Sequence, residues 1–131
     1  MRALDTNVLI RYLVQDDPAQ GKKAAAYIEG AESSGDPVLI GNIVLCETVW
    51  VLDSAYKFTK AEIQFALEKV LQASVFQFEV KDLIWSALKQ YGETKADFAD
   101  CLLGQVHKSL GSEPTATFDT SLSKLPTFRL L

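Results

Sequence analysis

The sequence predicts an α/β fold in which helices flank a central parallel sheet of four to five strands. One pattern in the chain predicts it. Short apolar runs alternate with longer segments of helical periodicity, and these runs cover residues 2–5, 38–41, 76–80, 115–118 and 128–131. Strands that alternate with helices pair in parallel, because each helix forms the crossover to the next strand. The length of 131 residues suits a single domain, residues 1–131.

The helical segments carry start and stop signals. Pro18 suits a first helical turn, and Asn42 is a candidate N-cap. Thr59 and Glu62 have capping-box spacing ahead of an amphipathic stripe. Gly92 and Gly111 are candidate ends of the last two helices. The helices are predicted over residues 7–15, 18–34, 42–56, 59–72, 81–91 and 95–111.

Two carboxylates directly follow predicted strands. Asp5 ends the first run, and Asp119 follows residues 115–118. Because ligands of parallel sheets bind beyond the carboxyl ends of the strands, both acids lie where a site is expected. Each acid also has a local structural interpretation. Asp5 could cap the following helix, although Thr6 is also available for that role. Asp119 could belong to a turn.

Glu47 is the only charged residue between Ile43 and Leu52, in "IVLCETVWVL". A helix that is apolar on nearly all sides is expected to be buried. A buried carboxylate without a partner costs several kcal/mol, so this position needs an explanation. The alternatives are a metal ligand and an ion pair with a buried Arg or Lys.

Asp100 lies in the apolar helical segment "ADFADCLLGQV", beyond the first turn where capping would explain it. Asp97 and Gly104 lie on the same side of this helix. Asp97 has two equally weighted interpretations, as a ligand and as a first-turn residue of a helix capped by Thr94. Gly104 costs about 1 kcal/mol relative to Ala in a helix, and room beside Asp100 is one reason to accept that cost.

The candidate acids form an all-oxygen donor set. Packed carboxylates raise one another's pKa, and a divalent cation reverses this effect. Hard oxygen ligands without a Cys or His pattern favour Mg²⁺ or Mn²⁺ over zinc, and such a site suits phosphodiester hydrolysis. The expected metal ligands are Asp5, Glu47, Asp97, Asp100 and Asp119.

Four segments, "LDTNVLI", "LCETVWVL", "DFADCLL" and "TFDTSL", occur in the order seen in PIN-domain ribonucleases. The chain most closely resembles the toxin component of VapBC-type toxin–antitoxin pairs. This resemblance implies a PIN-like three-layer fold and a metal-dependent endoribonuclease. By the same resemblance, the catalytic acids are Asp5, Glu47, Asp100 and Asp119.

The resemblance also assigns supporting residues and partners. Thr117 matches a hydroxyl position near the family's site, and Thr6 and Asn7 match the polar pair that orients the first acid. Asp97 is an extra acid in "DFAD". The implied partners are an RNA substrate, a cognate antitoxin protein that blocks the acidic pocket, and a second copy of the chain in a homodimer.

Charge and hydropathy limit the alternatives. A net charge of −4 and a pI of about 4.9 argue against broad, non-specific nucleic-acid binding, so RNA would be held by local cations. No apolar stretch approaches the length of a membrane span and no signal peptide is evident, so a cytoplasmic protein is expected. The candidate RNA-binding cations are Arg11, Lys22, Lys23, Lys57, Lys60, Lys95 and Lys108.

Two rival functions have sequence arguments. A Mg²⁺-dependent aspartate phosphotransferase or phosphatase would also place an Asp after the first strand. Such enzymes usually carry a second Asp two residues later, where this chain has Asn7. A non-catalytic module that binds RNA or protein is the other rival, and it leaves the four filled acid positions unexplained. His107, the only histidine, is not expected to be catalytic.

Overall fold

The computed structural model describes residues 1–131, which form two compact units, Met1–Lys81 and Asp82–Leu131. The first unit contains a three-stranded parallel sheet in the order β1-β2-β3. In this sheet Arg2 pairs with Val38, and Val38 pairs with Phe76. The strands are β1 (Arg2–Ala3), β2 (Val38–Ile40) and β3 (Phe76–Phe78).

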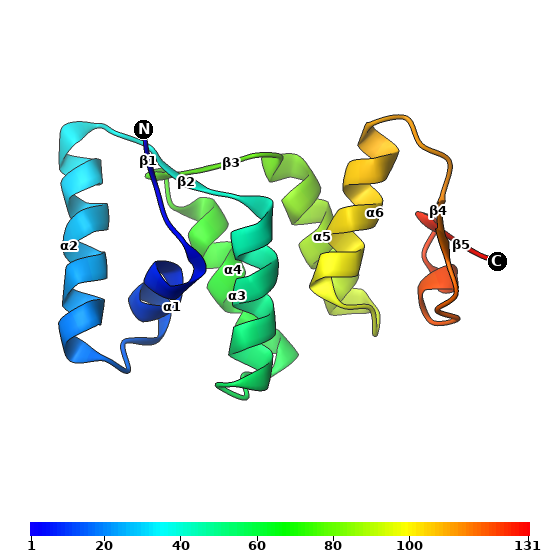
Figure 1. The fold of residues 1–131 in the computed structure, drawn as a ribbon, viewed down its shortest axis with the longest axis horizontal. Helices are drawn as coiled ribbons and strands as arrows, with labels where there is room; N and C mark the ends of the chain where they lie inside the picture. The colour runs from blue at the N-terminus through cyan, green and yellow to red at the C-terminus, as the bar shows by residue number, and fades with distance from the viewer. The chain divides into compact units, whose positions relative to one another are not determined.

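Four helices complete the first unit (Figure 1). Helix α1 packs against both α2 and α3, and α3 packs against α4. Gly21 of α2 is buried beside α1, and a Cβ at this position would lie 3.4 Å from the Arg11 carbonyl oxygen, an ordinary contact distance. The helices are α1 (Thr6–Val14), α2 (Pro18–Ser34), α3 (Asn42–Ser54) and α4 (Lys60–Gln72).

The second unit contains two helices and a two-stranded parallel sheet of β4 and β5. Thr115 pairs with Phe128, and Thr117 pairs with Leu130. A short 3-10 helix, η1, lies between the two strands in the sequence. The elements are α5 (Lys81–Glu93), α6 (Phe98–Ser109), β4 (Thr115–Thr117), η1 (Leu122–Lys124) and β5 (Phe128–Leu130).

The predicted α/β class and the parallel pairing are confirmed, and a strand lies at each of the five predicted places. The strands hydrogen-bond as one sheet of three and one sheet of two, whereas the sequence predicted a sheet of four to five. The single domain over residues 1–131 stays a prediction. No helix combines the length and the apolar character needed to cross a membrane.

Helix starts were predicted with mixed success. The capping box of α4 is confirmed, since the Thr59 hydroxyl accepts from the Glu62 N–H and the Glu62 carboxylate accepts from the Thr59 N–H. The prediction that Asn42 caps α3 is wrong. Gly41 occupies the cap position, and the carboxylate of Glu79, just after β3, accepts from the Asn42 backbone N–H at 2.5 Å.

Burial of α3 corrects a second prediction. The buried face of this helix consists of Leu45, Thr48, Val49 and Leu52, whereas Ile43 and Trp50 are 75% and 69% exposed. Glu47 lies on the exposed side. The apolar run therefore does not bury the whole helix, and Glu47 is not a buried charge.

The structure gives a different reason for a glycine at position 104 from the one that the sequence suggested. It lies on α6 and is buried. A Cβ at this position would lie 2.7 Å from Oγ1 of Thr127 and 2.9 Å from Cε2 of Phe128. The missing side chain thus makes room for the segment that enters β5, and the proposal that it makes room beside Asp100 is not needed.

Candidate functional site

Asp5 is fixed at the carboxyl end of β1 by the start of α1. It occupies the N-cap position in an extended conformation, and its Oδ1 accepts from the Val8 backbone N–H at 3.0 Å. The capping interpretation is therefore correct for this oxygen. Its Oδ2 has no hydrogen-bond partner, and the side chain is exposed. One carboxylate oxygen positions the side chain and the other is available to a ligand.

Glu47 is linked to the first turn of α1. The Thr6 hydroxyl donates to Glu47 Oε1 at 2.9 Å, which joins residues 41 positions apart in the sequence. No Arg or Lys forms an ion pair with Glu47, so the ion-pair interpretation of this residue is not supported. Asp5 and Thr6 are neighbours at the start of α1, and the Thr6 hydroxyl links Glu47 of α3 to this end of the helix.

The first unit has a cleft next to Asp5. This α1–α2 cleft encloses about 550 Å³ and is lined by β1, α1 and α2 residues that include Asp5, Asn7, Arg11, Lys23 and Tyr27. Asn7 is exposed on the first turn of α1 and forms no hydrogen bond to another side chain. Asn7 and Asp5 therefore border the same cleft.

The second unit holds a separate group of acids on α6 and after β4. Asp100 is half-buried, and this burial raises the pKa of its carboxyl above the usual range. The negative charges of Asp97 and Asp119 raise the pKa of Asp100 further. No basic side chain pairs with Asp100. These three carboxylates are therefore mutually repulsive and lack a counter-charge from the protein.

Asp97 occupies the N-cap position of α6, but its side chain makes no capping hydrogen bond. The predicted cap, Thr94, instead donates its hydroxyl to the backbone carbonyl of Gln90 at 2.7 Å, within the last turn of α5. Of the two interpretations of Asp97, the capping box is therefore wrong. Its carboxylate points free of the helix backbone and remains available to a ligand.

Asp119 is held by a turn after β4. Its Oδ1 accepts from the Ser121 hydroxyl at 2.6 Å and from the Ser121 backbone N–H at 2.9 Å. These hydrogen bonds lower the pKa of Asp119. The Thr117 hydroxyl accepts from the Asp119 backbone N–H at 3.0 Å. Thr117 therefore supports the acid through its backbone, and the turn interpretation of Asp119 is correct for Oδ1.

The donor chemistry fits a hard divalent cation. All five acids offer carboxylate oxygens, and no basic side chain pairs with the Asp97, Asp100 and Asp119 group. The structure contains no group of three His, Cys, Asp or Glu side chains arranged to hold one ion. The expected five ligands thus occur as two groups, one in each unit.

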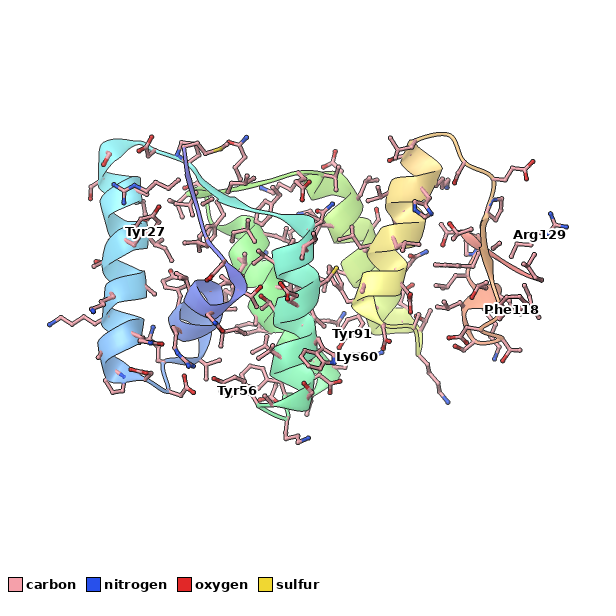
Figure 2. The ribbon with its side chains drawn as sticks, in the orientation of Figure 1. Tyr27, Tyr56, Lys60, Tyr91, Phe118 and Arg129 are labelled. Atoms are coloured by element: carbon pink, nitrogen blue, oxygen red, sulfur yellow. The ribbon has the colours of Figure 1, made fainter.

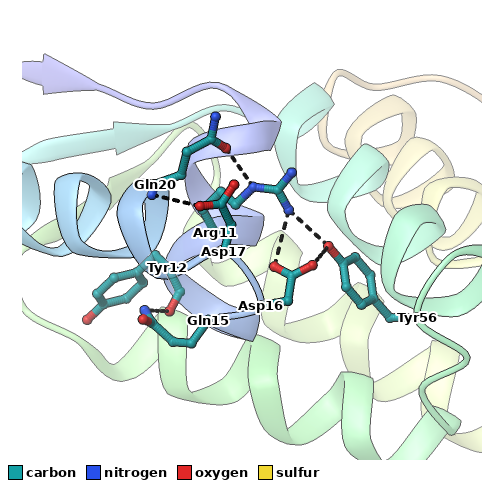
Figure 3. Close-up of polar contacts among 7 residues, drawn as sticks. All are labelled: Arg11, Tyr12, Gln15, Asp16, Asp17, Gln20 and Tyr56. Atoms are coloured by element: carbon teal, nitrogen blue, oxygen red, sulfur yellow. Dashed lines mark hydrogen bonds and ion pairs between the residues drawn. The ribbon is translucent and has the colours of Figure 1, made fainter.

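Sequence reasoning missed a polar network around Arg11. The guanidinium donates to Gln20, Asp16 and Tyr56, and Tyr56 in turn donates to Asp16 (Figure 3). The sequence indicated Arg11 only as one of several candidate RNA-binding cations. The residues Arg11 and Tyr56 are 45 positions apart, so no local pattern could have linked them.

Comparisons with known proteins identify the family of the chain. The family model for the PIN domain matches residues 2–127. A relative from Aquifex aeolicus (strain VF5), described as a VapC ribonuclease, is 27% identical over 125 residues, which cover 95% of this chain and 92% of the relative. No solved structure matches the chain significantly. Because the family model covers nearly the whole length of the chain, the protein belongs to the PIN domain family.

Proposed function

We propose that this protein is an endoribonuclease, the toxin of a toxin–antitoxin pair, that hydrolyses RNA phosphodiester bonds with the help of Mg²⁺ or Mn²⁺. The observation that carries the proposal is Asp100, a half-buried carboxylate that faces two further acids and no basic group. Membership of the PIN domain family and a VapC ribonuclease relative that matches almost the entire chain support RNA hydrolysis as the reaction of this protein.

Each acid has a role that its surroundings support. Asp5 in the first unit and Asp97 and Asp100 in the second each keep a carboxylate oxygen without a protein partner. These three residues and Asp119 would act as cation ligands, each within the acid group of its own unit. Glu47 Oε1 is occupied by Thr6, which leaves Oε2 to bind the cation or to accept a proton. A bound Mg²⁺ or Mn²⁺ lowers the pKa of a water molecule and offsets charge on the scissile phosphate.

The supporting residues restrict movement of these acids. Val8 holds Asp5 through its backbone N–H, and Thr6 holds Glu47 through its hydroxyl. Ser121 holds Asp119 through two hydrogen bonds to the same oxygen. Such fixed carboxylates lose little conformational freedom when they take up a ligand, which favours binding.

Cleavage assays test the proposal. A structured RNA is incubated with the protein in Mg²⁺, Mn²⁺ or EDTA, beside the variants Asp5→Asn and Asp100→Asn. We expect cleavage that requires the metal and falls at least 100-fold in both variants, as expected for the loss of a major catalytic group. Asp53→Asn is the matched control, because Asp53 is exposed on α3 and belongs to neither acid group.

The result that contradicts the proposal is equally specific. Cleavage that survives in EDTA, or that Asp5→Asn and Asp100→Asn leave unchanged, would place the activity elsewhere or in a contaminant. Asn preserves the N-cap acceptor at position 5, so Asp5→Asn keeps the helix start while it removes the charge. Loss of activity in this variant therefore cannot be blamed on unfolding of α1, and its thermal unfolding provides the check.

The partners follow from the same assignment. The toxin acts in the cytoplasm, where a cognate antitoxin binds it and blocks the acids. A homodimer has a candidate contact face on α3, where Ile43 and Trp50 are exposed. Sedimentation of the wild type and of Trp50→Glu tests this point: we expect a dimer that the variant dissociates, and a monomeric wild type would contradict it.

A further inference from the structure

The α1–α2 cleft has the size and the charge of a ligand site. Its volume of about 550 Å³ lies within the range of small-molecule pockets. Two cations, Arg11 and Lys23, and one carboxylate, Asp5, line it. Asp16 forms an ion pair with Arg11 at 3.2 Å, so the cationic groups left to meet a ligand are the Lys23 ammonium and the Nη2 edge of Arg11. The cleft therefore favours an anionic ligand next to Asp5.

Arg11 is held in place from three directions (Figure 3). Its Nε donates to Gln20 Oε1 at 2.7 Å, and its Nη1 donates to Asp16 at 3.2 Å and to the Tyr56 hydroxyl at 3.1 Å. Its Nη2 has no partner in the structure. The hydrogen bonds of Nε and Nη1 fix the position of the guanidinium, and Nη2 can still donate to a ligand. Such a guanidinium binds a phosphate with little further loss of side-chain conformational entropy.

Lys23 and Tyr27 lie four residues apart on α2, so they share the face that lines the cleft. Lys23 is exposed and forms no ion pair. The Tyr27 ring, labelled in Figure 2, is covered by the Arg2 guanidinium at 4.9 Å, and Arg2 also donates to the Tyr27 carbonyl. Tyr27 is still 41% exposed, so part of its aromatic surface is available.

We propose that the α1–α2 cleft binds one nucleotide of the RNA beside the phosphate that is cut, with Arg11 and Lys23 on its phosphate and Tyr27 against its base. The inference rests on the proposed ribonuclease function and names a substrate subsite for it. Two cations supply the sequence-independent affinity for the RNA backbone, and an aromatic ring tolerates any base. Asp5 at the edge of the cleft places this nucleotide next to the reacting group.

Binding and cleavage of a fluorescein-labelled single-stranded RNA of mixed sequence test the subsite. Binding is measured by fluorescence anisotropy in the Asp100→Asn background, which removes an acid of the other unit and leaves the cleft intact. We expect Lys23→Gln to weaken binding about fivefold and to lower the slope of log affinity against log salt by about 0.7. Lys22→Gln is the matched control, because Lys22 is the exposed neighbour of Lys23 and does not line the cleft.

Arg11 is tested by two variants that separate charge from position. Arg11→Gln is expected to weaken RNA binding about tenfold, as for the loss of a charged hydrogen bond. Tyr56→Phe keeps every charge but removes the hydroxyl that holds Nη1, so we expect two- to threefold weaker binding with an unchanged salt slope. In cleavage assays the cleft variants should raise KM and leave kcat within twofold, since the phosphate contact is present before and during the reaction.

The outcomes separate the subsite from the function. If the wild type cuts RNA while Lys23→Gln and Lys22→Gln bind it equally well, the subsite is wrong and the ribonuclease function stands. If unmodified protein neither binds nor cuts RNA, the proposed function fails. Variants that lose affinity for an antitoxin peptide but keep their affinity for RNA would assign the cleft to a protein segment and overturn the proposal. Lys23 is exposed, so its variant stays informative even if Arg11→Gln fails to fold.

Discussion

Gly104→Ala tests why a glycine lies one turn after Asp100 on α6. Replacement of Gly by Ala within a helix stabilises by about 1 kcal/mol when nothing opposes it. Here the new Cβ would lie 2.7 Å from Thr127 Oγ1, 2.9 Å from Phe128 Cε2 and 3.0 Å from Thr127 Cβ. Overpacking of this kind costs about 1–3 kcal/mol, because Thr127 is buried and cannot swing away. The free energy of unfolding should therefore fall by about 1 kcal/mol overall.

Urea denaturation of four variants, Gly104→Ala, Gly30→Ala, Thr127→Ala and the double variant at positions 104 and 127, tests this explanation. Gly30→Ala is the matched control on α2, where the new Cβ would meet only the flexible Arg2 guanidinium at 3.2 Å, so this variant should be as stable as the wild type or more stable. In the Thr127→Ala background, Gly104→Ala should cost at least about 0.5 kcal/mol less than in the wild type, because the closest contact is gone.

The refuting result concerns Asp100. If Gly104→Ala leaves stability unchanged or raises it, but reduces metal-dependent cleavage, then the glycine makes room beside the acid and the packing explanation is wrong. If packing is the reason, folded Gly104→Ala protein should cut RNA with an unchanged kcat at temperatures well below its unfolding transition.

Four further changes have defined outcomes. Thr48→Val should raise the free energy of unfolding by about 1 kcal/mol, since the Thr48 hydroxyl is fully buried without a partner; a loss of stability in urea would contradict this. Thr59→Ala should lower the same free energy by about 1 kcal/mol, because it removes the cap of α4. The backbone N–H of Thr59 lowers the pKa of Glu62, so the stabilisation from this carboxylate is present above its unfolded-state pKa of about 4.3 and is lost as the pH falls through the lower folded-state pKa. Glu62→Gln should accordingly flatten the acid side of the stability curve between about pH 3 and pH 5, and parallel curves would exclude the effect. Lys57→Gly should stabilise by about 0.5–1 kcal/mol, as Lys57 has a φ of 58°, and thermal unfolding reports the change.

Local signals predicted the elements well because their causes lie within a few residues. The capping box at Thr59 and Glu62 needs only the spacing of two side chains. Pro18 does begin α2, as its fixed φ suits a first turn. Asp5 follows β1 and begins α1, so its place beyond a strand end was readable from the alternation of apolar runs.

Predictions that depended on which face is covered were less successful. The apolar run around Glu47 indicated complete burial, yet Ile43 and Trp50 are exposed. Composition measures how much apolar surface a helix carries, but the neighbours decide how much of it is covered. The predicted cap at Thr94 is also wrong. The Thr94 hydroxyl donates to the backbone carbonyl of Gln90 in the preceding helix, so it does not cap α6.

The sequence alone determined the α/β class, the order of strands and helices, and the acids at or near element ends. Those properties follow from periodicity and from residue types at short range. Only the tertiary structure decided that Thr6 holds Glu47, that Tyr56 holds Arg11, and that Thr127 requires a glycine on α6. Each of these contacts joins residues more than 20 positions apart, and a single polar or steric contact at that separation leaves no repeating pattern in the chain.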